Sequence, residues 1–545
     1  MTAIETAAPS AGSAGAGLAA VADWVTTTDH KRIGRLYIGV SGLLLVAAAA
    51  VSALLSLERV DIDRQLVDIN SLTQLFALAR TGLLYLGLAP MLVGVAIAVV
   101  PLQLGSRSLT FPRLAAGGFW LWLFGAVLAI YSLLLNGGPG GGNPRFVDLY
   151  MLSMVLIIVG LVAGALSVAA TVLTSRSPGM SLRRVPFFSW SALISSLGIL
   201  IALPVLGGYL LVLYLAHKYP SLSELSGNRS VSEWAAFGFT QPATLLFAIP
   251  VLGLLLDVAA TAVRRRPTQR GAALAAVAIA GTAMIGPMLQ WPVVVRDGVA
   301  DLGAGQVVND LLPFGLVHGL PLLGVLGVIA AAARSLRTKP ALSAPLVAGL
   351  LGGLLVLLAA AASAANHIGD LGLVGTVFEE GALLAVVYGG TVSAMGAIAY
   401  WGPKWWGRTM PPVVSGLLVA LAGIGGALAS VSMLVAGLLD QPGAVFPTVE
   451  VGADAVVYFP DADGPLALLN GVSLLGHLAV LVAAVVFAVV ALQSFRSGSV
   501  AGDDPWDGQT LEWATTSPAP ADNFAEVHVV RSAEPLLDLK TRSDA

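Results

Sequence analysis

The sequence predicts an all-α integral membrane protein with twelve transmembrane helices and both termini in the cytoplasm. Of its 545 residues, 57% are hydrophobic and only 11% are charged, whereas soluble domains carry about 25% charged residues. A chain this poor in charge cannot cover a water-facing surface, so most of it must face lipid. The apolar runs are continuous rather than alternating, which favours helices over the strands of a barrel.

A bilayer crossing needs about 20 mostly apolar residues. Twelve such stretches follow one another, at 34–57, 72–103, 114–135, 147–174, 186–216, 234–263, 271–291, 309–333, 341–365, 371–401, 411–439 and 465–493. No internal repeat is evident. We therefore expect a membrane domain over 24–496, a disordered Ala-, Gly- and Ser-rich tail over 1–23, and a cytoplasmic C-terminal tail over 497–545.

Charge gives the expected orientation. Lys31, Arg32 and Arg35 lie at the start of the first span, and further basic residues fall in every second connection, including the run at 264–266. Under the positive-inside rule these connections are cytoplasmic. The last outer loop, 440–464, contains acidic residues and no basic one. The lipid bilayer is the expected partner because so few residues are charged, and a net charge of −3 with scattered basic residues indicates no nucleic-acid partner.

Several segments, most of them polar, resemble subunit I of the haem–copper oxidases, the cytochrome c oxidase subunit I family. They are WVTTTDHKRIGRL (24–36), PLQLGSRSLTFPRLAAGGFWLW (101–122), SPGMSLRRVPFFSWSALISSLGILIALPVLGG (177–208), QPATLLFAIP (241–250), YWGPKWWGR (400–408) and DDPWDGQTLEWATTSPAPADNFAEVHVVRSAEPLLDLK (503–540). They run in order from end to end. The resemblance implies a bacterial plasma membrane location and subunit II- or III-like membrane proteins as partners.

The same resemblance implies haem a, haem a3 and copper, held by neutral imidazoles, yet the matching positions carry none. Ala79 stands at the low-spin haem position of the second span, and Ala382 and Leu384 stand at the two ligand positions of the tenth. Gln241 replaces a copper histidine, and Leu245 replaces the tyrosine linked to one. These five residues mark lost ligands, so we expect no catalytic, cofactor or metal site and no bound cofactor.

Other functional positions of the family have changed as well. Ser108 aligns with the acid at one proton entrance, the outer metal-binding pair becomes Val374 and Gly375, and LLDQPGA (438–444) replaces the arginines that hold haem propionates. Of the six histidines, only His318 and His477 fall within spans. The chain is thus identified as a degenerate member of the family.

The ionisable residues Arg80, Asp257, Glu379 and Glu380 lie inside predicted spans, where each charge costs about 2.5–3.5 kcal/mol at the bilayer centre on insertion scales. Arg80 and the pair Glu379 and Glu380 enter their helices from the outer side to similar depth, roughly 12 Å. We expect Arg80 to pair with Glu379 or Glu380 in the space left by the low-spin haem; the alternative is a water-filled vestibule. Asp257 is expected to pair with the arginines at 264–266.

An anchor belt at the membrane interface is predicted at the end of the tenth span, from Trp401, Trp405 and Trp406 with Lys404 and Arg408.

For function, the leading hypothesis is a catalytically inactive structural or assembly subunit of a respiratory membrane complex. Two alternatives remain open. One is an active respiratory oxidase with non-standard ligation through His318, His477 or methionine. The other is a transporter or ion pathway through the emptied haem cavities.

Overall fold

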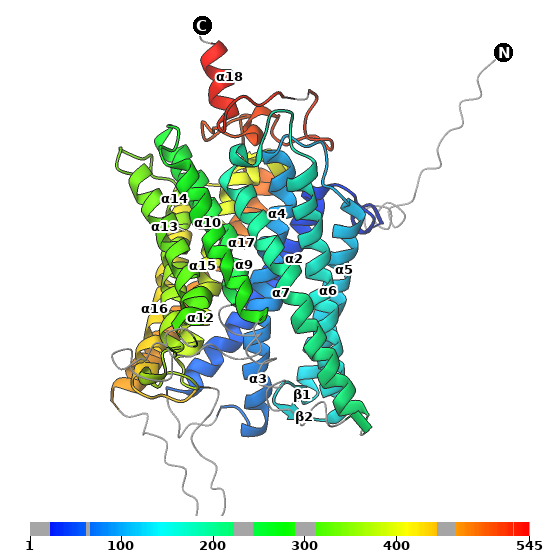
Figure 1. The fold of residues 1–545 in the computed structure, drawn as a ribbon, viewed down its shortest axis with the longest axis vertical. Coiled ribbons are helices and arrows are strands. Elements are labelled where there is room, and N and C mark those ends of the chain that lie inside the picture. Colours follow the sequence, from blue (N-terminus) through cyan, green and yellow to red (C-terminus); the bar gives the residue numbers. More distant parts are fainter. Residues whose placement is uncertain are drawn as a thin grey trace, which may run out of the picture.

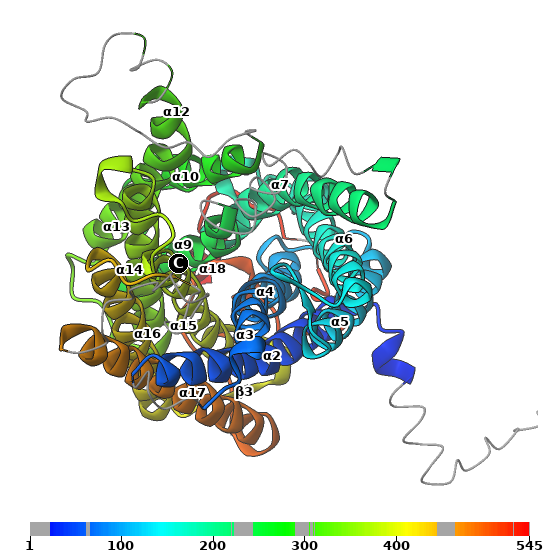
Figure 2. The same cartoon turned by 90° about the horizontal axis from the view of Figure 1, so that it is seen from below.

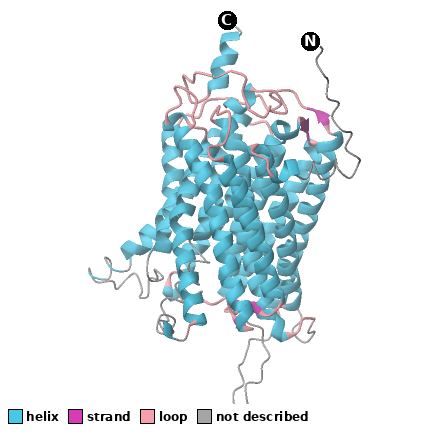
Figure 3. Ribbon diagram, turned by 90° about the vertical axis from the view of Figure 1, so that its right-hand side faces the viewer, coloured by secondary structure: helices cyan, strands magenta, loops and turns pink. Residues whose placement is uncertain are grey.

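The computed structural model describes residues 22–60, 66–219, 221–222, 243–288, 305, 309, 311–443, 464–526 and 528–543. Long helices run side by side along one axis (Figures 1 and 3), and loops and short helices cover the two ends. The predicted all-α membrane fold is confirmed. Residues 1–21 of the expected N-terminal tail lie outside the described residues.

The first half of the bundle contains α2 (His30–Glu58), α3 (Ile69–Thr81), the π-helical η1 (Gly82–Leu88), α4 (Ala89–Gln103), α5 (Pro112–Leu134), α6 (Pro144–Thr174), η2 (Leu182–Arg184), α7 (Phe187–Lys218) and α9 (Ala243–Val263). The second half contains α10 (Arg270–Ala280), η4 (Gly281–Met288), α12 (Leu312–Phe314), the π-helical η7 (Gly315–Gly319), α13 (Leu320–Ser335), α14 (Ala344–Asn366), η8 (Gly369–Leu371), α15 (Phe378–Trp406), α16 (Pro412–Leu438) and α17 (Pro465–Ser497). The short helices η9 (Leu511–Ala514) and α18 (Pro535–Ser543) follow.

Among the described residues, eleven helices are long and apolar enough to cross a membrane. The predicted span at 271–291 is the exception, because its apolar helix, Arg270–Gly286, is shorter and its description stops at residue 288. The count of twelve therefore stays a prediction. The second span is continuous from α3 through η1 into α4.

Local sequence fixes where several helices begin and end. The side chains of Asp29 and Asn143 accept hydrogen bonds from the backbone amides of Lys31 and Arg145, which caps the first turns of α2 and α6. At the C-terminal end of α15, Gly407 has a φ of 76°. Glycine adopts this left-handed conformation without strain, and it ends the helix.

The second and tenth spans form the centre of the bundle (Figure 2). The apolar part of the α3–α4 span is wholly buried and that of α15 is 94% buried, against 28% for the peripheral α17. The two central spans touch: a Cβ added at Gly390 of α15 would lie 2.0 Å from Cδ1 of Leu88. Glycine at this position therefore allows the two helices to pack directly.

The two ends of the bundle differ. At the hairpin end, β1 (Gly137–Gly138) pairs with β2 (Gly141–Gly142). At the opposite end, which we call the tail end, β3 (Arg408–Thr409) pairs with β4 (Ser499–Val500), and the C-terminal segment (499–526 and 528–543) covers the helices. The start of α2 lies there too, since Lys31 Nζ donates to Asn523 Oδ1 at 3.0 Å.

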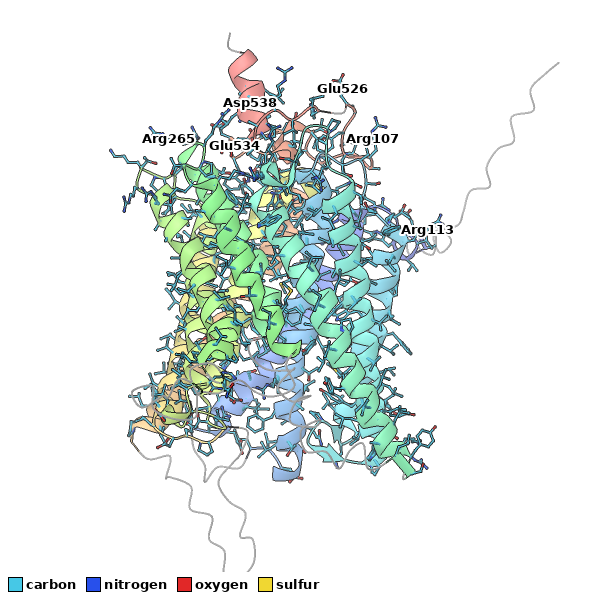
Figure 4. The ribbon with its side chains drawn as sticks, in the orientation of Figure 1. Arg107, Arg113, Arg265, Glu526, Glu534 and Asp538 are labelled. Carbon is cyan, nitrogen blue, oxygen red and sulfur yellow. The ribbon has the colours of Figure 1, made fainter. Side chains whose placement is uncertain are left out.

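Figure 4 shows Arg107, Arg113 and Arg265 at the tail end, together with Glu534 and Asp538. The positive-inside pattern predicts that this end is cytoplasmic. The described start of α2 and the C-terminal segment thus share one end, as the sequence predicts for the two termini.

Candidate functional site

A cavity of about 200 Å³ opens near the hairpin end, between α2, α3 and α15. Its apolar wall includes Leu55, Phe76 and Leu83, and its polar lining consists of Ser52, Thr376 and the charged residues predicted from sequence, Arg80, Glu379 and Glu380. The structure therefore brings these three charged residues to one cavity.

Two ion pairs differ in geometry at this cavity. Arg80 Nη2 lies 3.7 Å from Glu379 Oε2, too far for a direct hydrogen bond, and the Arg80 side chain is 42% exposed. Glu380 has a different partner: Arg59 Nη2 donates to its Oε2 at 2.9 Å, and the Arg59 side chain is only 4% exposed. The tight, buried pair is thus Arg59–Glu380.

Arg59 follows directly after α2, in the connection between the first and second spans. Its guanidinium lies 5.2 Å from the ring centroid of Phe76 and contacts Met433 Sδ at 3.7 Å, while its carbonyl accepts from Asn470 at 3.1 Å. The residue therefore ties α2 to α3, α15, α16 and α17. A basic residue at the end of an apolar span is the only sequence signal that could have marked it.

The carboxylate of Glu379 has a second neighbour, since Asn366 Nδ2 donates to Oε1 at 3.3 Å. Next to Asn366, His367 stacks on His318 of η7, with ring centroids 4.1 Å apart and planes inclined by 25°. Stacked imidazoles present their faces to each other. Their nitrogen lone pairs lie in the ring planes, so the two rings cannot clasp one metal between them.

The other histidine within a span, His477, lies on α17. Its Nδ1 is 2.5 Å from the hydroxyl of Tyr388 on α15, and the side chain is fully buried. Met91 of α4 and Met395 of α15, which lie in the helices expected to flank the low-spin haem, pack in two separate apolar clusters. These residues serve helix packing in this structure.

The lost-ligand positions divide into three groups. Ala79 and Leu384 line the cavity, so the structure brings them together. Ala382 packs with Phe378 and Leu434 away from it, and Leu245 belongs to the main core. Gln241 lies outside the described residues.

The residues at the expected low-spin haem position do not fit a haem. Alanine and leucine side chains offer no lone pair to iron. The cavity, at about 200 Å³, is also smaller than the roughly 300–1,000 Å³ of sites for ordinary small ligands. No reaction step through a haem follows from this geometry.

A second polar cluster lies at the tail end, around Asp257 of α9. Asp257 accepts from the backbone amides of Phe187 and Phe188 at 3.1 and 2.9 Å, and from Gln103 Nε2 at 3.0 Å. The predicted pairing of Asp257 with the arginines at 264–266 is therefore wrong. The first turn of α7 presents unpaired amides to the carboxylate, which accepts its hydrogen bonds from these amides and from Gln103 rather than from the arginines at 264–266.

Those arginines bind the C-terminal segment instead. Arg264 Nε lies 3.3 Å from Asp507, and Arg266 pairs with Asp538. Arg270, at the start of α10, lies 3.3 Å from Glu534. The basic connection after α9 thus holds the acidic side chains of the segment that folds over it.

The predicted interfacial belt at the end of α15 is wrong for Trp401, Trp405 and Lys404, which are buried. Trp401 and Lys404 are fully buried, because the C-terminal segment covers them. Lys404 Nζ donates to the carbonyls of Asp503 and Thr515 at 2.6 and 2.5 Å, and Trp401 Nε1 donates to Glu512 at 3.2 Å. These side chains bind protein rather than the headgroup region.

Comparison with known proteins decides the family. Residues 32–479 match the family described as cytochrome c and quinol oxidase polypeptide I. The chain belongs to this family. The match covers most of the chain, so the oxidase subunit I-like protein is a multi-pass protein of the bacterial plasma membrane.

Individual relatives agree along nearly the whole length. A probable cytochrome c oxidase subunit 1-beta of Nocardia farcinica is 30% identical, covering 94% of this chain and 87% of that protein. Cytochrome c oxidase subunit 1 of Bacillus subtilis is 25% identical, covering 94% and 82%. A haem–copper terminal oxidase dimer shares the fold, with a TM-score of 0.63, 14% identity, and coverage of 94% of this chain and 89% of that one.

Proposed function

We propose that this subunit I-like protein is a non-catalytic structural or assembly subunit of a respiratory membrane complex. The observation that carries the proposal is the packing at the expected haem position. Ala79 and Leu384, which the family resemblance aligns with two haem-ligand positions, line one cavity together with the arginine–glutamate pair Arg80–Glu379. Protein side chains thus take the place of the iron ligands.

Close packing beneath the cavity supports the same proposal. Leu83 and Leu384 are 2% and 1% exposed, and Leu88 reaches Gly390 across the interface of the two central spans. A planar macrocycle between these helices would have to separate them and leave their apolar side chains unpacked. The expected partners remain subunit II- or III-like membrane proteins.

Purification of the tagged full-length protein from its own membranes tests the proposal. We expect no haem bands in the reduced-minus-oxidised spectrum, no stoichiometric copper, and co-purification of other membrane subunits. An active subunit I prepared in the same way is the positive control. Haem bands would support an oxidase with unusual ligation, while a colourless preparation without partner subunits would contradict an assembly role.

A solute pathway is the second candidate, favoured by the open geometry at Arg80. Its guanidinium is accessible in the cavity and lies 3.7 Å from Glu379 without a hydrogen bond, an arrangement in which a polar solute could bridge the two groups. Proteoliposome flux assays with small ions and zwitterions test this function. Flux that Arg80→Gln abolishes would favour it, and absence of flux in the wild type would reject it.

A further inference from the structure

Two carboxyl groups at the tail end are buried around a single amide. Asp257 Oδ2 and Glu512 Oε1 both accept a hydrogen bond from Gln103 Nε2, at 3.0 and 3.1 Å. The two oxygens are therefore no more than about 6 Å apart, a distance at which like charges repel strongly away from water. Asp257 is 7% exposed and Glu512 is fully buried.

Their hydrogen-bond donors are unequal. Asp257 accepts from two backbone amides at the start of α7 in addition to Gln103, and the N-terminus of a helix favours an anion. Glu512 accepts on Oε1 from the side chains of Gln103 and Trp401, and its remaining neighbours, the Thr510 side chain and its own backbone amide, lie within the C-terminal segment. The negative charge is thus better satisfied on Asp257.

Other charged and titratable groups near the pair are already engaged. From α15, Lys404 binds two carbonyls of the C-terminal segment, and the Tyr400 hydroxyl lies 2.9 Å from Thr261 of α9. From the start of α10, Arg270 pairs with Glu534. The pKa of Glu512 is raised from its ordinary value of 4.5 to about 7, mainly because the carboxyl group is buried and also because Asp257 is negatively charged.

We propose that Asp257 and Glu512 form a one-proton binding site that couples docking of the C-terminal segment to protonation. With the proton on Glu512, the pair carries one negative charge and the segment stays seated over α4, α9 and α15. Loss of that proton leaves two buried carboxylates around Gln103. Release of the segment then relieves the repulsion, because Glu512 moves into water while Asp257 stays in the bundle.

The direction of the pH effect follows from the raised pKa of Glu512. The contribution of Glu512 to docking is largest below pH 4.5, is lost as the pH rises toward about 7, and changes little above that. Closing the segment near neutral pH therefore takes up a proton. This coupling needs neither haem nor catalysis, so it stands or falls separately from the assembly role.

Hydrogen exchange of the full-length protein in detergent tests the proposal. The readout is the opening equilibrium of backbone amides in 509–524, corrected for the pH dependence of intrinsic exchange. We expect it to be about 30-fold larger at pH 8 than at pH 5.5. Glu512→Gln, which keeps an oxygen acceptor and adds no charge, should abolish this difference. Glu526→Gln, in an exposed part of the same segment (Figure 4), should retain it.

A second variant is needed if Glu512→Gln releases the segment at every pH, because that variant would then show no pH response for a different reason. Asp257→Asn removes the neighbouring charge but leaves Glu512 in place, so the change between pH 5.5 and pH 8 should shrink. An unchanged pH response in both variants, or no response in the wild type, would overturn the proposal. Helices away from the segment should exchange as in the wild type throughout.

Discussion

The two ends of the bundle handle buried charge in different ways. At the hairpin end, opposite charges meet in the pairs Arg59–Glu380 and Arg80–Glu379. At the tail end, the like charges of Asp257 and Glu512 share one amide donor. Opposite charges satisfy each other at any ordinary pH, whereas two buried carboxyl groups are compatible only if one is protonated. Substitutions at the hairpin end should therefore change the stability of the bundle, and substitutions at the tail end should change the docking of the C-terminal segment.

The largest effect is expected from Arg59→Leu. This change leaves Glu380 partly buried without its hydrogen-bonded cation, which should lower the free energy of unfolding by about 3–5 kcal/mol. Unfolding in mixed SDS and non-ionic detergent micelles measures it. The exposed Arg145 at the same end provides the control, since Arg145→Leu should change little. Adding Glu380→Leu to Arg59→Leu should recover most of the loss, and failure to recover would deny that the pair is the cause.

Packing between the central spans should come next. Gly390→Ala forces a methyl group against Leu88, with 2.0 Å between Cβ and Cδ1 before any adjustment, so we expect a loss of about 1–3 kcal/mol. Gly208→Ala is the matched change, because a Cβ there meets nothing within 4 Å. If Gly390→Ala were as well tolerated as Gly208→Ala, the two spans would not be in direct contact.

Lys404→Met tests the tail end without touching the carboxyl pair. The change removes the donor of the Asp503 and Thr515 carbonyls, which should weaken docking of the C-terminal segment by about 1–3 kcal/mol. Limited proteolysis should then cut the segment faster while the bundle stays intact. Lys339→Met, at an exposed position, serves as control. Equal cleavage of both variants would show that Lys404 does not hold the segment.

The smallest effect on stability is expected at the partly exposed pair Arg80–Glu379. Arg80→Gln should cost less than about 1 kcal/mol, because Arg80 and Glu379 are partly exposed and not hydrogen-bonded to each other. A double-mutant cycle with Arg80→Glu and Glu379→Arg measures the coupling. We expect a small, salt-dependent coupling that is weaker than the coupling between Arg59 and Glu380; a larger one would reverse our order of the two pairs.

Some residues of the candidate site can be predicted from the sequence and others cannot. The depth of Arg80 and Glu379 along their helices can be counted from sequence, and the resemblance places those helices face to face. The partner of Glu380 cannot be found in this way. Arg59 comes just after a span, where the usual expectation is a headgroup contact, and only the closeness of α2 to α15 turns its side chain inward.

The errors at the tail end have one common cause. Sequence alone pairs Asp257 with the nearest arginines along the chain and places the tryptophans of α15 at the membrane interface. Both predictions assume that the C-terminal segment extends into water. The segment folds back over the bundle, so it supplies the acidic partners of Arg264 and Arg266 and covers Lys404. Contacts between residues 404 and 515 depend on chain folding over long distances, which neither hydropathy nor local charge encodes.

The sequence by itself determined the membrane-spanning character, most of the helix boundaries and the family, and it predicts that histidine is absent from the ligand positions. These features depend on composition, on periodicity and on which residue stands at which place. Only the tertiary structure decided the partners of the buried charges, Arg59 for Glu380 and Gln103 for both Asp257 and Glu512. The free energy of a buried charge is set by the few atoms around it, and those atoms come from distant parts of the chain.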